Sequence, residues 1–100
     1  MLRINGYTVL TATTGRDALD LLETQRPDLI LMDMAMPEID GWSATAQIKA
    51  APHLLHIPVV AVTSHATSDE LNRALAAGCQ DYITKPIDYE QLITKVQVNI

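Results

Sequence analysis

The sequence predicts an α/β fold in which helices cover both faces of a parallel sheet. Two observations lead to this prediction: short apolar, β-branched runs alternate with segments of helical periodicity, and clusters of Gly, Pro and polar residues separate them. Strands that alternate with helices favour parallel pairing through right-handed crossovers. The predicted strands are residues 7–12, 29–33, 57–62 and 81–84.

The first two helices are predicted from capping and stop signals between these strands. Thr14 can cap a helix that ends before Pro27, and a second helix opens at Gly41 and ends at Pro52. Their apolar positions recur at helical spacing, so each can place one face on the sheet.

The last two helices carry clearer signals. Ser68-Asp69-Glu70 is typical of a first helical turn, Gly78 stands where a left-handed C′ glycine is expected, and Asp88 is a candidate cap for the final helix. The side chains expected to face inward are Leu71, Ala74 and Leu75 in the third helix and Leu92, Val96 and Ile100 in the last.

Composition limits the function. The chain has 100 residues, 48% of them hydrophobic, which suits one domain over residues 1–100. Its net charge of −5 argues against direct binding to nucleic acid or to an anionic membrane, so we expect protein partners. There is no apolar stretch of membrane-spanning length and no signal-like start, and Cys79 is the single cysteine; we expect a cytoplasmic location.

Polar residues follow three of the predicted strands at their carboxyl ends. Asp33 ends one apolar run, Thr63 follows another, and Lys85 follows the last. Because parallel strands end at the same edge of a sheet, we expect a carboxylate, a hydroxyl and an ammonium group to meet there.

These segments resemble a known family. The sequences LILMDMAMPEIDG (29–41), VAVTSHA (60–66) and AGCQDYITKP (77–86) are similar to motifs of the receiver domains of two-component response regulators, in kind, order and distance along the chain. The resemblance implies the flavodoxin-like, CheY-like fold with strand order 2-1-3-4-5.

The resemblance also implies a site. Asp33 would accept a phosphoryl group from a histidine kinase or phosphotransfer protein, and Thr63 would donate its hydroxyl to a phosphoryl oxygen. Lys85 would supply a positive charge. Asp33 and the backbone carbonyl of Ala35 would be ligands to Mg²⁺.

Further features follow from the same resemblance. Tyr82 would be an aromatic switch residue acting together with Thr63, and the Lys85–Pro86 bond a cis peptide. The contact face for partners would combine residues 68–77, the strand with Tyr82 and the helix from Asp88. We expect a phosphoacceptor rather than an enzyme, with slow self-dephosphorylation as its one catalytic act.

The chain departs from the receiver pattern at its beginning. Residues 1–6 match only the last turns of the family's first helix, and no acidic residue precedes Asp17, so the first strand and its Mg²⁺-binding acidic pair are missing. We therefore expect weak Mg²⁺ binding. The missing strand belongs between residues 7–12 and 29–33, where its loss would leave unpaired backbone groups on both neighbours.

Three arrangements would repair this gap. The true start lies upstream, or the sheet closes directly or with a partner's strand, or two copies exchange elements in a domain-swapped dimer. For the chain as given we expect a homo-oligomer rather than a monomer.

Two functions remain open from the sequence. One is the phosphoacceptor signalling domain; the alternative is a phosphorylation-independent interaction or dimerisation module, a degenerate receiver. A phosphatase of the haloacid dehalogenase type needs a second Asp two residues after the nucleophile, and that position is Ala35, so this enzyme class is disfavoured.

Overall fold

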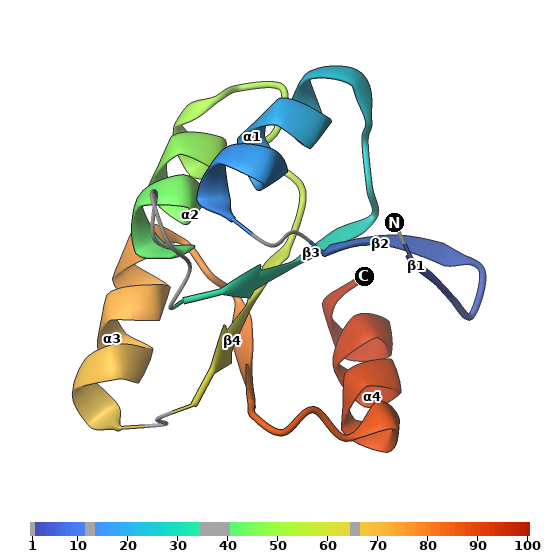
Figure 1. Ribbon diagram of the computed structural model, residues 1–100, viewed down its shortest axis with the longest axis vertical. Helices are drawn as coiled ribbons and strands as arrows, with labels where there is room; N and C mark the ends of the chain where they lie inside the picture. The colour runs from blue at the N-terminus through green and yellow to red at the C-terminus, as the bar shows by residue number, and fades with distance from the viewer. Residues whose placement is uncertain (1, 12–13, 35–40, 65–66) are drawn as a thin grey trace.

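A computed structural model describes residues 2–11, 14–34, 41–64 and 67–100, with the backbone alone for residues 41 and 42. In these ranges the chain forms an α/β structure (Figure 1). Its strands are β1 (Leu2–Ile4), β2 (Tyr7–Thr11), β3 (Leu29–Asp33), β4 (Val59–Thr63) and β5 (Asp81–Thr84). Its helices are α1 (Gly15–Thr24), α2 (Gly41–Ala50), α3 (Ser68–Ala77) and α4 (Tyr89–Asn99).

Among the described residues the strands form a five-stranded sheet in the order β1-β2-β3-β4-β5. The pairs β2–β3, β3–β4 and β4–β5 are parallel, and β1 is antiparallel to β2. The predicted class, a mostly parallel sheet between helices, is confirmed.

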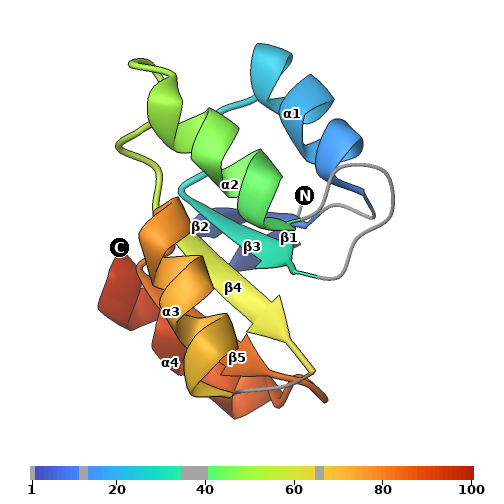
Figure 2. The ribbon, with the colours of Figure 1, turned by 90° about the vertical axis from the view of Figure 1, so that its left-hand side faces the viewer.

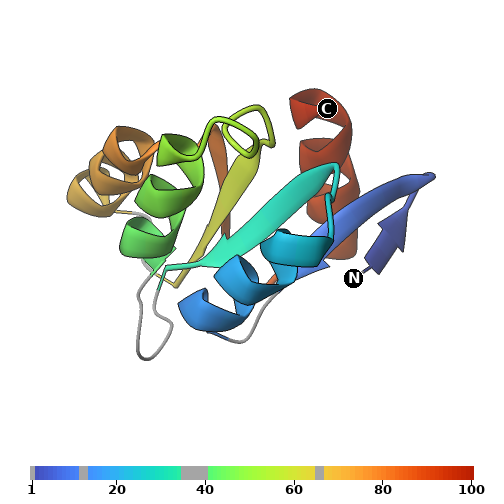
Figure 3. The same cartoon turned by 90° about the horizontal axis from the view of Figure 1, so that it is seen from above.

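The helices cover the two faces of the sheet unequally. Helices α1, α2 and α3 lie on one side, which we call the three-helix face, and α4 lies on the other, the one-helix face (Figures 2 and 3). The buried core of the three-helix face includes Leu10, Leu22, Ile30, Met32, Ile48 and Ile57. The core of the one-helix face includes Ile4, Val9, Leu29, Leu31, Val60, Val62, Ile83, Leu92 and Val96.

The predicted capping residues are confirmed. Thr14 Oγ1 accepts from the amide of Asp17 at 3.0 Å, and Asp88 Oδ1 accepts from the amide of Glu90 at 3.1 Å. Gly78 ends α3 with a φ of +113°, the left-handed conformation that glycine adopts most readily. The helix ends are therefore determined locally, by the residue types at the caps.

The expected helical character is wrong for residues 2–6, the part of the segment 1–6 that the structure describes. These residues instead start with the strand β1, which turns through Asn5 and Gly6 into β2. Both turn residues have positive φ, +50° and +85°, as a two-residue hairpin loop of this kind requires. Ile4 is buried against the one-helix face, so burial of an apolar side chain supports the hairpin.

The expected gap in the sheet is also absent from the described structure, and the implied order 2-1-3-4-5 does not apply. Strand β2 pairs directly with β3, in the register Val9 with Leu29. Asp28 extends the ladder, since its amide donates to Thr8 O at 2.8 Å and its carboxylate accepts from the Thr8 amide at 2.7 Å. The ladder groups therefore satisfy one another, and direct closure is the arrangement that the structure describes.

Two residues expected to face the core do not. Leu75 is 58% exposed and Ile100 is 44% exposed, whereas Ala74, Leu92 and Val96 are buried as predicted. Leu75 is exposed because it lines an open pocket between α3 and β5, an outer strand of the sheet. None of the helices in the described ranges combines the length and apolar character of a membrane span.

Candidate functional site

The carboxyl ends of β3, β4 and β5 meet at one edge of the sheet. Register pairs Asp33 with Val62 and Thr63 with Thr84, so the polar residues that follow from each strand lie side by side. The amide of Lys85 donates to Thr63 O at 2.8 Å, which continues the ladder by one residue. The sheet thus brings Asp33, Thr63 and Lys85 to the predicted edge.

Asp33 and Lys85 form a direct ion pair. Lys85 Nζ lies 2.5 Å from Asp33 Oδ2, across 52 residues of sequence. The side chains are 34% and 37% exposed, so solvent screens the pair and its contribution to stability is small, at most about 1 kcal/mol. The chemical consequence is larger: an ammonium group neutralises a carboxylate that solvent can reach.

A shallow pocket of about 170 Å³ opens beside this pair on the one-helix face. It has room for a small anion and a few waters, since each water occupies about 30 Å³ in the liquid. The residues lining it are Thr11, Leu31, Asp33, Val62, Lys85 and Ile87. Among the described residues that line the pocket, Asp33 and Lys85 carry the charge and the other walls are mostly apolar.

The Thr63 hydroxyl makes a contact that the sequence did not predict. Thr63 is a buried polar residue, and its Oγ1 donates to Glu70 Oε2 at 3.0 Å. Thr63 does not line the pocket beside Asp33. The structure brings Thr63 to the predicted edge of the sheet, with its hydroxyl hydrogen-bonded to Glu70 of α3.

Tyr82 lies on the surface of β5, 39% exposed. Lys95 Nζ is 5.4 Å from the centroid of its ring, within the range of a cation–π contact, and 2.8 Å from Asp81 Oδ1. Asn99 Nδ2 donates to the other Asp81 oxygen at 3.1 Å. Burial raises the pKa of Asp81, but the hydrogen bonds from Lys95, Asn99 and the Tyr82 amide outweigh it and hold the pKa below its usual value.

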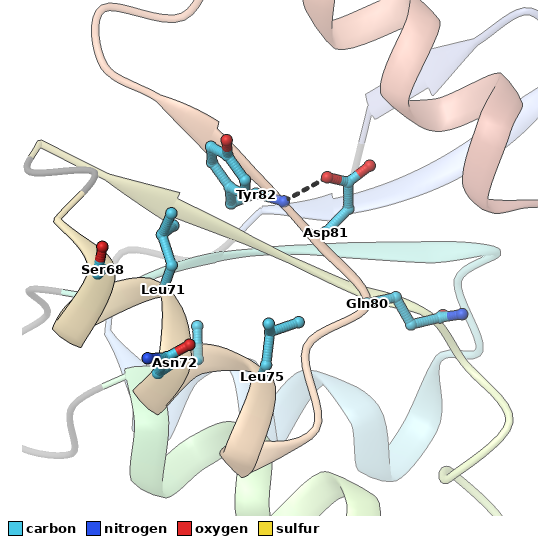
Figure 4. Close-up of a pocket in the computed structure, with 8 residues that line it drawn as sticks. Ser68, Leu71, Asn72, Leu75, Gln80, Asp81 and Tyr82 are labelled. Atoms are coloured by element: carbon cyan, nitrogen blue, oxygen red, sulfur yellow. Dashed lines mark hydrogen bonds between the residues drawn. The ribbon is translucent and has the colours of Figure 1, made fainter.

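A larger pocket, of about 420 Å³, lies between α3 and β5. Figure 4 shows Leu71 and Leu75 of α3 on one side and Asp81 and Tyr82 of β5 on the other, with Ser68 at the end of the helix. This pocket coincides with part of the surface predicted to contact partners.

The metal ligands are only partly defined. Asp33 is exposed enough to bind a cation, but Ala35, the other predicted ligand, lies outside the described residues. In the described part of the chain there is no group of three or more acidic, His or Cys side chains that could hold a metal ion. One carboxylate is a poor set of ligands for Mg²⁺, so the residues described do not make a complete site.

Cys79 is unsuited to nucleophilic chemistry. It is buried, its Sγ lies 3.8 Å from Thr45 Oγ1, and burial raises the pKa of the thiol. Nearby, burial lowers the pKa of Lys49, whose Nζ donates to Ile57 O at 2.6 Å and to Leu55 O at 3.0 Å. Both groups have structural roles.

The sequence did not single out Glu70, Thr11 or Ile87 as site residues. Glu70 was predicted only as part of a helical first turn, and its contact with Thr63 depends on how α3 docks. Thr11 and Ile87 line the pocket beside Asp33 because of the register of β2 and the path after β5.

The structure is thus an α/β domain with a carboxylate paired to a lysine, next to a threonine, at the carboxyl edge of a parallel sheet. The chain belongs to the response regulator receiver domain family, whose model matches residues 1–97. The flavodoxin-like fold and the two-component signalling function follow from this membership.

Relatives and solved structures agree. The polar-differentiation response regulator DivK of Brucella anthropi is 39% identical over 97 residues, covering 97% of this chain and 79% of that protein. The receiver domain of a histidine kinase from Syntrophus aciditrophicus superposes with a TM-score of 0.80 at 36% identity, covering 94% of this chain and 71% of that one.

Two further structures bear on the site. The receiver domain of the sensor kinase PA1611 from Pseudomonas aeruginosa, with a magnesium ion coordinated in its active-site cleft, has a TM-score of 0.81 at 36% identity, covering 93% of this chain and 76% of that one. The chemotaxis regulator CheY4 of Vibrio cholerae has a TM-score of 0.87 at 26% identity, with coverages of 95% and 79%.

Family membership sets the general role. Receiver domains are phosphoacceptors, generally not enzymes, and they interact with histidine kinases or phosphotransfer proteins. Receiver domains bind Mg²⁺ in the active site, as the PA1611 structure illustrates.

Proposed function

We propose that this chain accepts a phosphoryl group on Asp33 from a phosphohistidine of a kinase or phosphotransfer protein. The observation that supports this most directly is the contact between Asp33 and Lys85 beside an open pocket. The ammonium group cancels the charge of the carboxylate, so an incoming phosphoryl group meets less repulsion.

The transfer itself needs little from the protein besides positioning. A carboxylate oxygen of Asp33 forms a bond to phosphorus as the P–N bond to the donor imidazole breaks, and the bonding pair returns to the imidazole nitrogen. Lys85 then lies within reach of the new negative charge, and Thr63 would donate its hydroxyl to a phosphoryl oxygen. When bound, Mg²⁺ would supply further positive charge next to Asp33, but the ligands described are too few for a step to depend on it.

Partner contacts are proposed on the surface formed by α3, β5 and α4. The pocket between α3 and β5, with exposed Leu75 and Tyr82 at its rim, could take an apolar side chain of a partner. Tyr82 is proposed as the switch residue of this surface. The proposal includes a cytoplasmic location and slow loss of the phosphoryl group by hydrolysis, and it treats residues 1–100 as one domain.

The test is incorporation of label from radioactive acetyl phosphate, with and without Mg²⁺. The wild-type chain should acquire label that hydroxylamine removes, as expected of an acyl phosphate, and Asp33→Asn should acquire none. Asp20→Asn is the matched control, because Asp20 is an exposed carboxylate on α1. Label that persists in Asp33→Asn would refute the assignment.

The alternative function is a phosphorylation-independent interaction or dimerisation module. It is favoured by the incomplete ligand set in the described residues. A homo-oligomer, including a domain-swapped dimer, belongs to this alternative. Light scattering with and without Mg²⁺ and beryllofluoride separates the two: a dimer indifferent to both additives supports the module, and a response to both supports the phosphoacceptor.

A further inference from the structure

The hydroxyl of Thr63 is already engaged in this structure. Its Oγ1 lies 3.0 Å from Glu70 Oε2. An ionised carboxylate can only accept a hydrogen bond, and a threonine hydroxyl carries one proton, so Thr63 is the donor in this contact with Glu70.

Glu70 is held in place by the start of α3. Thr67 caps the helix, and its Oγ1 accepts from the amide of Glu70 at 3.3 Å. The pattern of Thr67 followed by Glu70 at the third helical position is that of a capping box. The Glu70 side chain reaches Thr63, so that the first turn of α3 is tied to the end of β4.

The Thr63 side chain and the pocket beside Asp33 lie on opposite faces of the sheet. Val62 points to the one-helix face, where it lines the pocket beside Asp33. Successive residues of a strand point to opposite faces, so the Thr63 side chain starts from the three-helix face, on the same side as α3. Its hydroxyl must therefore turn to reach a group bound on Asp33.

We propose that Glu70 is a positioning residue whose carboxylate competes with a phosphoryl group on Asp33 for the single proton of the Thr63 hydroxyl. The inference rests on the proposed phosphoacceptor function. In the unmodified protein Glu70 holds Thr63 on the three-helix face; when a phosphoryl group is present, Thr63 donates to it and the bond to α3 breaks. Because coupling between two sites is reciprocal, loosening the first turn of α3 strengthens binding at Asp33.

The experiment measures the affinity of the purified chain for beryllofluoride in excess Mg²⁺. Replacing Glu70 by Ala should tighten binding about 2- to 10-fold, the range expected for the loss of one competing hydrogen bond. Glu70→Gln, which keeps an acceptor oxygen without the charge, should give a smaller effect and serves if the Ala variant does not fold. Asp69→Ala is the matched control, because it removes a carboxylate from the same helical turn.

A Thr63→Val background separates the hydrogen bond from simple charge effects. Glu70→Ala should have no effect on affinity there, because no hydroxyl proton is left to release. Hydrogen exchange supplies a second measurement: beryllofluoride should speed exchange of the amides in the first turn of α3 in the wild type, and should add nothing in Glu70→Ala.

Each outcome decides a different proposal. Suppose that the wild type binds beryllofluoride but the affinity of Glu70→Ala equals that of the wild type or that of Asp69→Ala. The role of Glu70 is then refuted and the phosphoacceptor function stands. The same conclusion follows if Glu70→Ala still tightens binding when position 63 is Val. If only the Glu70 variants bind, the competition by Glu70 is supported and lowers the affinity for beryllofluoride by more than about 10-fold. If neither wild type nor variants bind, the phosphoacceptor function fails and this inference falls with it.

Discussion

Replacing Gly78 by Ala should destabilise the fold more than the same change at Gly6. Both glycines have positive φ, +113° and +85°, which costs an L-residue about 1–2 kcal/mol. A Cβ at Gly6 would meet nothing within 4 Å, whereas a Cβ at Gly78 would lie 2.6 Å from Lys49 Cγ. Gly6→Ala is therefore a matched control for the backbone term alone.

The contact with Lys49 cannot be relieved freely. Its Nζ donates to Leu55 O and Ile57 O, so moving the stem to make room strains or breaks these bonds. We assign this term about 1–2 kcal/mol, typical of overpacking. The lower entropy of the unfolded chain raises the free energy of unfolding of either variant by about 0.4–1 kcal/mol. The expected losses are about 2–3 kcal/mol for Gly78→Ala and about 1 kcal/mol for Gly6→Ala.

Urea unfolding followed by circular dichroism measures both values, provided that the m-value is unchanged. The double variant Gly78→Ala with Lys49→Ala should lose less than the sum of the single losses, because truncating Lys49 removes the clash. Equal losses at the two glycines, or strictly additive losses at Gly78 and Lys49, would refute the reasoning.

Three other predictions address the outer strand, the one-helix face and the partner surface. Asp81→Asn should destabilise the protein at neutral pH and lose this effect as pH falls below about 4. The pKa of Asp81 is lowered in the folded state, so its carboxylate stabilises the fold above the ordinary pKa of 3.8, and this stabilisation disappears as the folded protein takes up the proton. Urea unfolding at several pH values tests this. Val96→Ala should cost about 2 kcal/mol in the same assay, since Val96 is fully buried; a loss below about 0.5 kcal/mol would mean that α4 is loosely packed. Tyr82→Ala should weaken phosphorylation-dependent binding of a partner, and unchanged affinity in a titration with phosphorylated protein would contradict the proposed switch role.

Much of the fold was predictable because its signals are local. Thr14, Gly78 and Asp88 act through their own backbone neighbours, so residue type and position were enough to predict the helix ends. The three polar residues at the strand ends were predictable because parallel strands finish at a common edge, whatever their exact register.

The errors came from features that depend on partners distant in sequence. Direct pairing of β2 with β3 was one of three arrangements that the sequence left open, because strand pairing depends on which other strands are present. Asn5-Gly6 is a strong hairpin signal, whereas the resemblance to the receiver family implies the end of a helix at these positions. The contact of Glu70 with Thr63 could not be predicted, because a capping pattern determines where a helix starts and leaves open what the side chain touches.

The unequal cover of the sheet also affects how the protein opens. Because α4 provides the helical cover of the one-helix face, unfolding of this one segment would expose Val9, Leu29 and Ile83 together while the strands stay paired. Such a partial opening needs less free energy than global unfolding, so amides of α4 should belong to an early-exchanging unit and those of β3 and β4 to the last. The same opening would turn a buried sheet face into a transient apolar surface that proteases, chaperones or a second copy of the chain could contact.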